Sequence, residues 1–176
     1  DEITAATPTV EARFSIGGPV EDHACFEDAV AAQAAEPLPD RTEGQDMLYS
    51  SGTTGRPKGV KSPLPGVALG QANSITMMAE ALFGATPGSV YLSPAPLYHA
   101  APLRFCLGAH RLGCTVVVME RFDAEGALAA IQDHGVTWSQ WVPTMFVRML
   151  KLSEEVRAAY DLSTLGSAIH AAAPCP

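Results

Sequence analysis

The run Met47-Leu-Tyr-Ser-Ser-Gly-Thr-Thr-Gly-Arg-Pro-Lys-Gly-Val60 places glycines, hydroxyls and a lysine directly after a short apolar segment typical of a strand. Glycine adopts backbone conformations that let successive amides point toward one anion. Hydroxyl groups would add donors, and a lysine would add a mobile positive charge suited to phosphate oxygens. The run therefore predicts a polyphosphate-binding loop, whose candidate ligands are Ser50, Ser51, Gly52, Thr53, Thr54, Gly55, Lys58 and Gly59.

This order of residues differs from the P-loop of nucleoside triphosphatases. The P-loop requires Gly-Lys-Ser/Thr after four intervening residues and then a helix, whereas this chain has Pro57-Lys58-Gly59 followed by prolines at 63 and 65. The loop itself must therefore hold the anion. The alternative for a short Ser/Thr/Gly tract is an ordinary polar turn.

Strand and helix patterns alternate on both sides of the loop. We expect strands at residues 12–16, 47–49, 89–92, 115–119, 136–139 and 166–169. We expect helices at residues 25–35, 66–83, 101–112, 123–135 and 143–152, with Asp123 as an N-cap. The alternation predicts an α/β fold with parallel, doubly wound sheets and helices on both faces. Ligand groups in such folds gather outside the carboxyl ends of strands, where 50–58 and 96–99 fall.

Composition narrows the class of protein. The chain has 176 residues, 47% of them hydrophobic and 17% charged, which fits a folded protein of one domain or two small ones. A net charge of −8 argues against a nucleic-acid-binding or anionic-membrane surface. No apolar run is long enough to span a bilayer, and the acidic N-terminus lacks the pattern of a secretion signal, so we expect a cytoplasmic protein. The scattered cysteines predict neither disulfides nor a protein metal site.

Beyond these patterns, residues 49–59 resemble, nearly letter for letter, the signature loop of the adenylate-forming superfamily, which includes acyl-CoA synthetases and peptide-synthetase adenylation domains. Further segments are similar to that family in the same order: 93–103, 113–123, 141–144 and 171–176. The resemblance implies an internal fragment of a large N-terminal region built from two flavodoxin-like subdomains. Residues 1–87, with the loop at 50–59, would end the first subdomain, and residues 88–176 would form part of the second. The lack of an initiator Met and the end inside a motif agree with a fragment.

The resemblance also implies a two-step reaction. A carboxylate attacks the α-phosphorus of ATP to give an acyl-adenylate and pyrophosphate, and the thiol of coenzyme A then displaces AMP to give a thioester. Lys58, Thr53 and Thr54 would hold the β- and γ-phosphates, with Mg²⁺ bridging the oxygens. The partners would be small molecules, namely an acid, ATP and CoA, with no nucleic acid; the oligomeric state is left open.

The remaining site residues also follow from the resemblance. His99 would border the acyl carboxylate and the α-phosphate, the alternative being a capping or core histidine. The acyl pocket would be lined by Tyr98, His99, Trp141, Val142, Pro143 and Thr144, several of which could equally be core. Adenine would meet Ala172, Ala173 and Pro174, although Ala171 and Ala172 stand where the family usually has paired glycines.

Two other functions are kept open. An adenylation domain would pass its acyl group to a carrier protein instead of CoA, and a non-catalytic module would bind ATP as a structural or regulatory ligand. Apolar residues around the acyl segment favour a fatty or other apolar acid, but they do not distinguish aliphatic from aromatic acids. We expect this fragment alone to be inactive, because the family's metal-linked glutamate, ribose-binding aspartate and C-terminal lysine would lie beyond Pro176.

Overall fold

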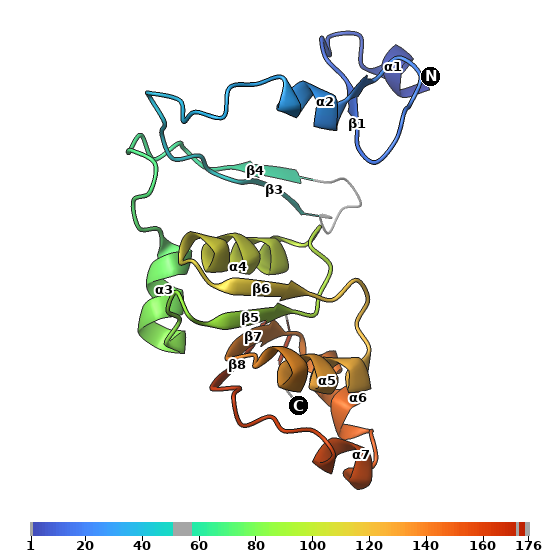
Figure 1. Cartoon of the computed structure of the whole chain (residues 1–176), viewed down its shortest axis with the longest axis vertical. Coiled ribbons are helices and arrows are strands. Elements are labelled where there is room, and N and C mark those ends of the chain that lie inside the picture. The colour runs from blue at the N-terminus through green and yellow to red at the C-terminus, as the bar shows by residue number, and fades with distance from the viewer. Residues whose placement is uncertain (1, 51–57, 172, 175–176) are drawn as a thin grey trace. The chain divides into compact units, whose positions relative to one another are not determined.

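The computed structural model describes residues 2–50, 58–171 and 173–174. Its contacts divide the chain into two compact units, residues 1–41 and residues 42–176, which are described separately (Figure 1). The subdomain boundary expected at residue 87 falls between a helix and a strand of the second unit and stays a prediction.

The first unit contains short elements only: α1 (Glu2–Ala6), β1 (Phe14–Ser15), β2 (Ala24–Cys25) and α2 (Phe26–Ala31). β1 and β2 pair in parallel. The helix expected at 25–35 is much shorter, and no residue of α2 is buried. Since most helical stability in proteins comes from packing an apolar face, an alanine-rich pattern without such packing sustains few turns.

The second unit contains a hairpin, a four-stranded sheet and their helices. The elements are β3 (Met47–Ser50), β4 (Lys58–Lys61), α3 (Ser74–Phe83), β5 (Val90–Ser93), α4 (Ala100–Arg111), β6 (Thr115–Val118), α5 (Ala124–His134), β7 (Trp138–Trp141), α6 (Pro143–Leu150), α7 (Glu154–Ala158) and β8 (Ser167–His170). β3 and β4 are antiparallel, whereas β6-β5-β7-β8 form a parallel sheet in that order. The predicted α/β class with a parallel sheet is confirmed. The sequence patterns missed β4 and α7.

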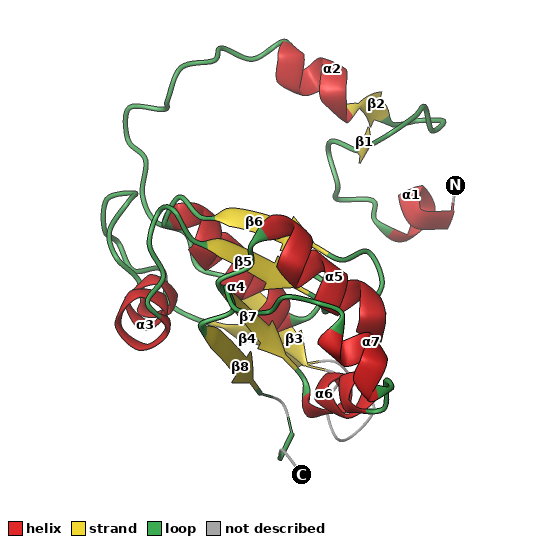
Figure 2. Cartoon of the chain, turned by 60° about the horizontal axis from the view of Figure 1, so that its bottom comes forward, coloured by secondary structure: helices red, strands yellow, loops and turns green. Residues whose placement is uncertain are grey.

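The strand order contains a point at which the chain changes direction across the sheet. From β5 the chain moves outward to β6 through α4, and from β6 it returns past β5 to β7 through α5. The helices α4 and α5 lie on opposite faces of the sheet (Figure 2). The crevice between the carboxyl ends of β5 and β7 is therefore a topological switch point, where ligands bind in open α/β sheets.

Alternating side chains of the sheet supply two cores. On the α4 face, Tyr91 and Trp138 are buried with ring centroids 4.5 Å apart. On the α5 and α6 face, Leu92 and Trp141 are buried with Ile131. Because successive side chains of a strand point to opposite faces, β5 contributes one residue after another to the two cores. The switch point is thus set in a rigid, doubly packed sheet.

Local signals decide where the helices begin and end. The helix expected from residue 66 begins only at Ser74, because Asn73 caps it: Asn73 Oδ1 accepts from the Thr76 N–H at 3.0 Å, and Thr76 Oγ1 accepts from the Asn73 N–H at 3.1 Å. Gly84 ends α3 with φ 66°, in agreement with the prediction. Asp123 is confirmed as the N-cap of α5, with Oδ2 accepting from the Gly126 N–H at 2.6 Å.

Among the described residues, no helix is both long and apolar enough to cross a membrane. The cytoplasmic location stays a prediction.

Candidate functional site

The described ends of the predicted phosphate loop belong to a hairpin. Lys58 is the first residue of β4 and pairs with Ser50, the last residue of β3. Lys58 and Gly59, the last two residues of the expected loop, already belong to β4, and the role of Lys58 as a phosphate ligand stays a prediction. The lysine side chain is exposed. The structure therefore presents Lys58 at the carboxyl end of β3, beside the segment predicted to bind phosphate.

Five candidate phosphate ligands, Ser51, Gly52, Thr53, Thr54 and Gly55, lie outside the described residues. Gly59 was expected to present its amide as part of the loop, but it lies in β4 opposite Tyr49. A Cβ atom on Gly59 would come within 2.7 Å of Met47 Cε and 3.2 Å of Tyr49 Cε1. A larger residue at position 59 would therefore have to displace the ends of the exposed Met47 and Tyr49 side chains.

His99 stands at the switch point, immediately before α4. It occupies the N-cap position, but its ring makes no capping hydrogen bond, and its side chain is exposed. The Tyr98 ring lies beside it, with centroids 4.5 Å apart, and is itself 83% exposed. Among the described residues, the alternatives of a capping or a core histidine therefore do not describe this ring.

The predicted acyl segment leaves the adjacent strand at the same edge of the sheet. Trp141 ends β7 and is only 1% exposed, with its ring centroid 5.8 Å from Phe146. It packs in the core on the α5 and α6 face, so core packing accounts for its side chain. Pro143 is also buried, as the first residue of α6. Val142 is half-buried and Thr144 is exposed, which leaves these two best placed to contact an acid.

The predicted adenine segment leaves β8, the next strand, at this edge. The Ala171 N–H donates to the Trp141 carbonyl at 3.2 Å, which extends the β7–β8 pairing toward the segment. Ala173 and Pro174 follow and are exposed, whereas Ala172 lies outside the described residues. Three segments far apart in sequence, after β5, β7 and β8, are thus brought to one edge of one sheet.

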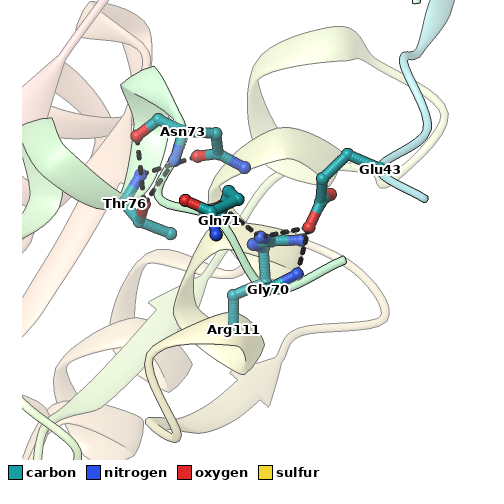
Figure 3. A network of polar contacts seen from close by, with 6 residues as sticks. All are labelled: Glu43, Gly70, Gln71, Asn73, Thr76 and Arg111. Carbon is teal, nitrogen blue, oxygen red and sulfur yellow. Dashed lines mark hydrogen bonds and ion pairs between the residues drawn. The ribbon is translucent and has the colours of Figure 1, made fainter. Parts of the chain in front are cut away.

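Sequence reasoning missed two charge pairs that join α4 to the segment leading into β3. Arg111 donates through Nη1 to Glu43 Oε2 at 2.9 Å and through Nη2 to Glu43 Oε1 at 2.8 Å (Figure 3). Arg104 donates through Nη2 to Asp46 Oδ1 at 3.0 Å. The Arg111 guanidinium, with the Gly70 N–H, holds the pKa of Glu43 below its usual value. The sequence did contain one indication of these pairs: the two arginines are seven residues apart on a predicted helix, which places them on the same face of that helix.

The described chain also has a hollow of about 720 Å³ between α4, residues 43–48 and residues 65–75. Both charge pairs line it, but none of the predicted site residues does. Because the sequence-predicted site residues lie elsewhere, we place the candidate site at the switch point. Within the described ranges, no three His, Cys, Asp or Glu side chains gather as metal ligands.

Comparisons with known proteins match this architecture. A family described as "AMP-binding enzyme" matches residues 3–176. "Probable CoA ligase CCL5" from Humulus lupulus is 35% identical over 132 residues, covering 73% of this chain and 23% of that protein. "4-coumarate--CoA ligase 5" from Oryza sativa subsp. japonica is 33% identical over 170 residues, covering 90% and 30%.

A solved structure is also similar. The N-terminal domain of FACL13 from Mycobacterium tuberculosis, crystallised with an inhibitor, matches with a TM-score of 0.68 and 26% identity, covering 85% of this chain and 37% of that one. The chain spans less than a third of the length of the two relatives named above.

Proposed function

Because the chain belongs to the AMP-binding enzyme family, whose matching relatives are named as CoA ligases, we propose that the full-length protein is an ATP-dependent acid–CoA ligase. It would join a carboxylic acid to ATP as an acyl-adenylate and then transfer the acyl group to CoA. The observation that carries the proposal is the convergence of three segments, after β5, β7 and β8, at the switch point of the parallel sheet.

In the first step, a carboxylate oxygen of the acid forms a bond to the α-phosphorus of ATP. The bond from that phosphorus to the bridging oxygen breaks, and pyrophosphate leaves. Negative charge grows on the leaving phosphates, so the exposed Lys58 and the hydroxyls of Thr53 and Thr54 would stabilise the transition state. Mg²⁺ would enter with ATP, bound to its phosphate oxygens, as hard cations prefer.

His99 would act where the acid and the nucleotide meet. Its uncapped, exposed ring can donate a hydrogen bond to the developing charge at the α-phosphate, and Tyr98 lies against it. In the second step, the CoA thiolate forms a bond to the acyl carbon, and the bond from that carbon to the AMP oxygen breaks. Ala172, Ala173 and Pro174 would border the adenine, at the end of β8.

The substrate would be an apolar acid. Val142 is half-buried, and its chain neighbours Trp141 and Pro143 are buried. The carboxyl end of β7 therefore offers an acid an apolar surface. Fatty acids and aromatic acids both meet this description, and one relative carries the name of an aromatic acid, 4-coumarate.

The test is carboxylate-dependent exchange of labelled pyrophosphate into ATP by the full-length protein, with a panel of short, long and aromatic acids including 4-coumarate. Lys58→Ala is compared with Lys61→Ala, because both lysines are exposed ends of the same strand, three residues apart. We expect Lys58→Ala to lower the exchange rate by about 10²–10³-fold, the usual cost of losing one charge-stabilising donor. Lys61→Ala should retain nearly all of the rate.

Each result has a distinct meaning. Exchange with one class of acid, lost in Lys58→Ala alone, would support adenylation and name the substrate. Thioester formed on a carrier protein but not on CoA would replace the ligase by an adenylation domain. ATP binding without exchange for any acid would refute the proposed reaction in favour of a non-catalytic module.

A further inference from the structure

We propose that Arg104 and Arg111 are positioning residues that hold the β3–β4 hairpin alongside the N-terminal end of α4, and so set how far along the hairpin Lys58 stands from His99. The inference rests on the proposed function for the role of those two residues in catalysis. The arginines touch no predicted substrate residue and would act only through Asp46 and Glu43.

Each arginine makes a two-pronged contact with one carboxylate. Arg104 donates through Nη2 to Asp46 Oδ1 at 3.0 Å, and its Nε forms an ion pair with the other oxygen, Oδ2, at 3.0 Å. Arg111 binds both oxygens of Glu43 and donates a third hydrogen bond to the Gln71 carbonyl at 2.7 Å (Figure 3). The Gly70 N–H also donates to Glu43. A planar guanidinium that meets a carboxylate in this way fixes direction as well as distance.

The two contacts define a register between helix and strand. Arg104 and Arg111 are seven residues apart on α4, which is about 10.5 Å at 1.5 Å per residue. Glu43 and Asp46 are three residues apart, which is roughly 10 Å for extended chain. The distances match only if α4 and the approach to β3 run in opposite directions, since the later arginine meets the earlier carboxylate.

This register carries the N-terminal end of α4 to the carboxyl end of β3. His99 precedes Arg104 by five residues, or about 7.5 Å of helix. In an extended strand, about 7.5 Å is covered by roughly two residues, so His99 lies level with Leu48, two residues after Asp46. Ser50 ends β3 two residues later and pairs with Lys58. The two forks therefore determine which part of the hairpin faces His99.

The hairpin lies outside the packed cores of the sheet. Among the described residues, neither core cluster of the second unit includes a residue of β3 or β4. α4 is bound to the sheet through its opposite side, by Phe105, Cys106 and Ala109. These ion pairs lie outside the core clusters that hold α4 on the sheet, so removing them should leave the sheet folded while freeing the hairpin. A shift of about 1 Å at reacting groups lowers rates by as much as 100-fold.

The test compares the double variant Arg104→Met/Arg111→Met with Arg157→Met, a matched loss of charge on α7, in the full-length protein. We expect kcat/KM for ATP in pyrophosphate exchange to fall about 10- to 100-fold in the double variant. The KM for the acid and the thermal midpoint should stay close to wild type, and Arg157→Met should match wild type in all three. Arg104→Lys/Arg111→Lys should recover little, because an ammonium cannot form the fork.

A second readout does not depend on activity. Spin labels at Leu97→Cys and Val60→Cys, with Cys25 and Cys175 replaced by serine, report the distance between the start of α4 and β4. We expect one narrow distance in the parent background and a broad or shifted distribution in the double variant. An unchanged distance, or a loss of kcat/KM explained entirely by unfolding, would overturn the inference. If the wild type exchanges no pyrophosphate, the proposed function fails, while the spin-label distances still decide whether the arginines position the hairpin.

Discussion

Replacement of Trp138 tests the packing that holds β7 in place and, with it, the acyl segment. The Trp138 side chain is 1% exposed, and its ring centroid lies 4.5 Å from Tyr91, 6.3 Å from Phe83 and 6.2 Å from Phe105. A buried aromatic side chain removes about 200 Å² from water, worth about 5 kcal/mol at 25 cal/mol per Å². Alanine keeps a small part of that area, so Trp138→Ala should lower the free energy of unfolding by about 3–5 kcal/mol.

Trp138→Phe provides the sharper comparison. Trp138 Nε1 is buried without a hydrogen-bond partner among the described residues. An unpaired buried N–H costs about 1–3 kcal/mol, and phenylalanine removes it. The two carbons that are lost with it cost about 1.6 kcal/mol at roughly 0.8 kcal/mol per buried carbon. The two changes nearly cancel, so we expect Trp138→Phe to lie within about 1.5 kcal/mol of wild type.

The assay is urea unfolding of the full-length protein followed by far-UV circular dichroism, with the slope m compared between variants. A Phe variant as unstable as the Ala variant would refute the reasoning, since Nε1 would then have a partner in the folded protein. An Ala variant that loses less than about 1 kcal/mol would show that the ring is not part of the core.

Two further predictions concern the ends of α5 and α4. Asp123→Ala should lower the free energy of unfolding by about 1 kcal/mol, because it removes the N-cap of α5. Asp123→Asn keeps a capping oxygen and should lower it by only about a few tenths of a kcal/mol. Equal losses for the two variants in urea titrations would contradict a capping role. Arg111 and the Gly70 N–H lower the pKa of Glu43 in the folded protein. The ionised Glu43 carboxylate therefore stabilises the fold at pH values above its pKa in the unfolded chain, and this stabilisation is lost as the pH falls through the lower pKa of the folded state. Glu43→Gln should therefore flatten the decline of the thermal midpoint between about pH 5 and about pH 3, and an unchanged slope would rule out this linkage.

Much of the fold could be predicted because its signals are local. The Asp123 cap, the Gly84 stop and Pro143 at the start of α6 each act within a few residues. Predictions failed where a local pattern had no tertiary support: the alanine-rich segment after Cys25 forms only a short helix, and the helical pattern from residue 66 yields to the Asn73 cap.

The sequence by itself determined the α/β alternation, the segments at 96–99 and 141–144 that end up at one sheet edge, and the family resemblance of residues 49–59. Only the tertiary structure decided that β5 and β7 are neighbours, because strand order depends on contacts between residues far apart in the chain. The same is true of the two arginine forks. Their partners lie 58 and 68 residues away along the chain, and no local pattern specifies which carboxylate a long, mobile side chain will meet.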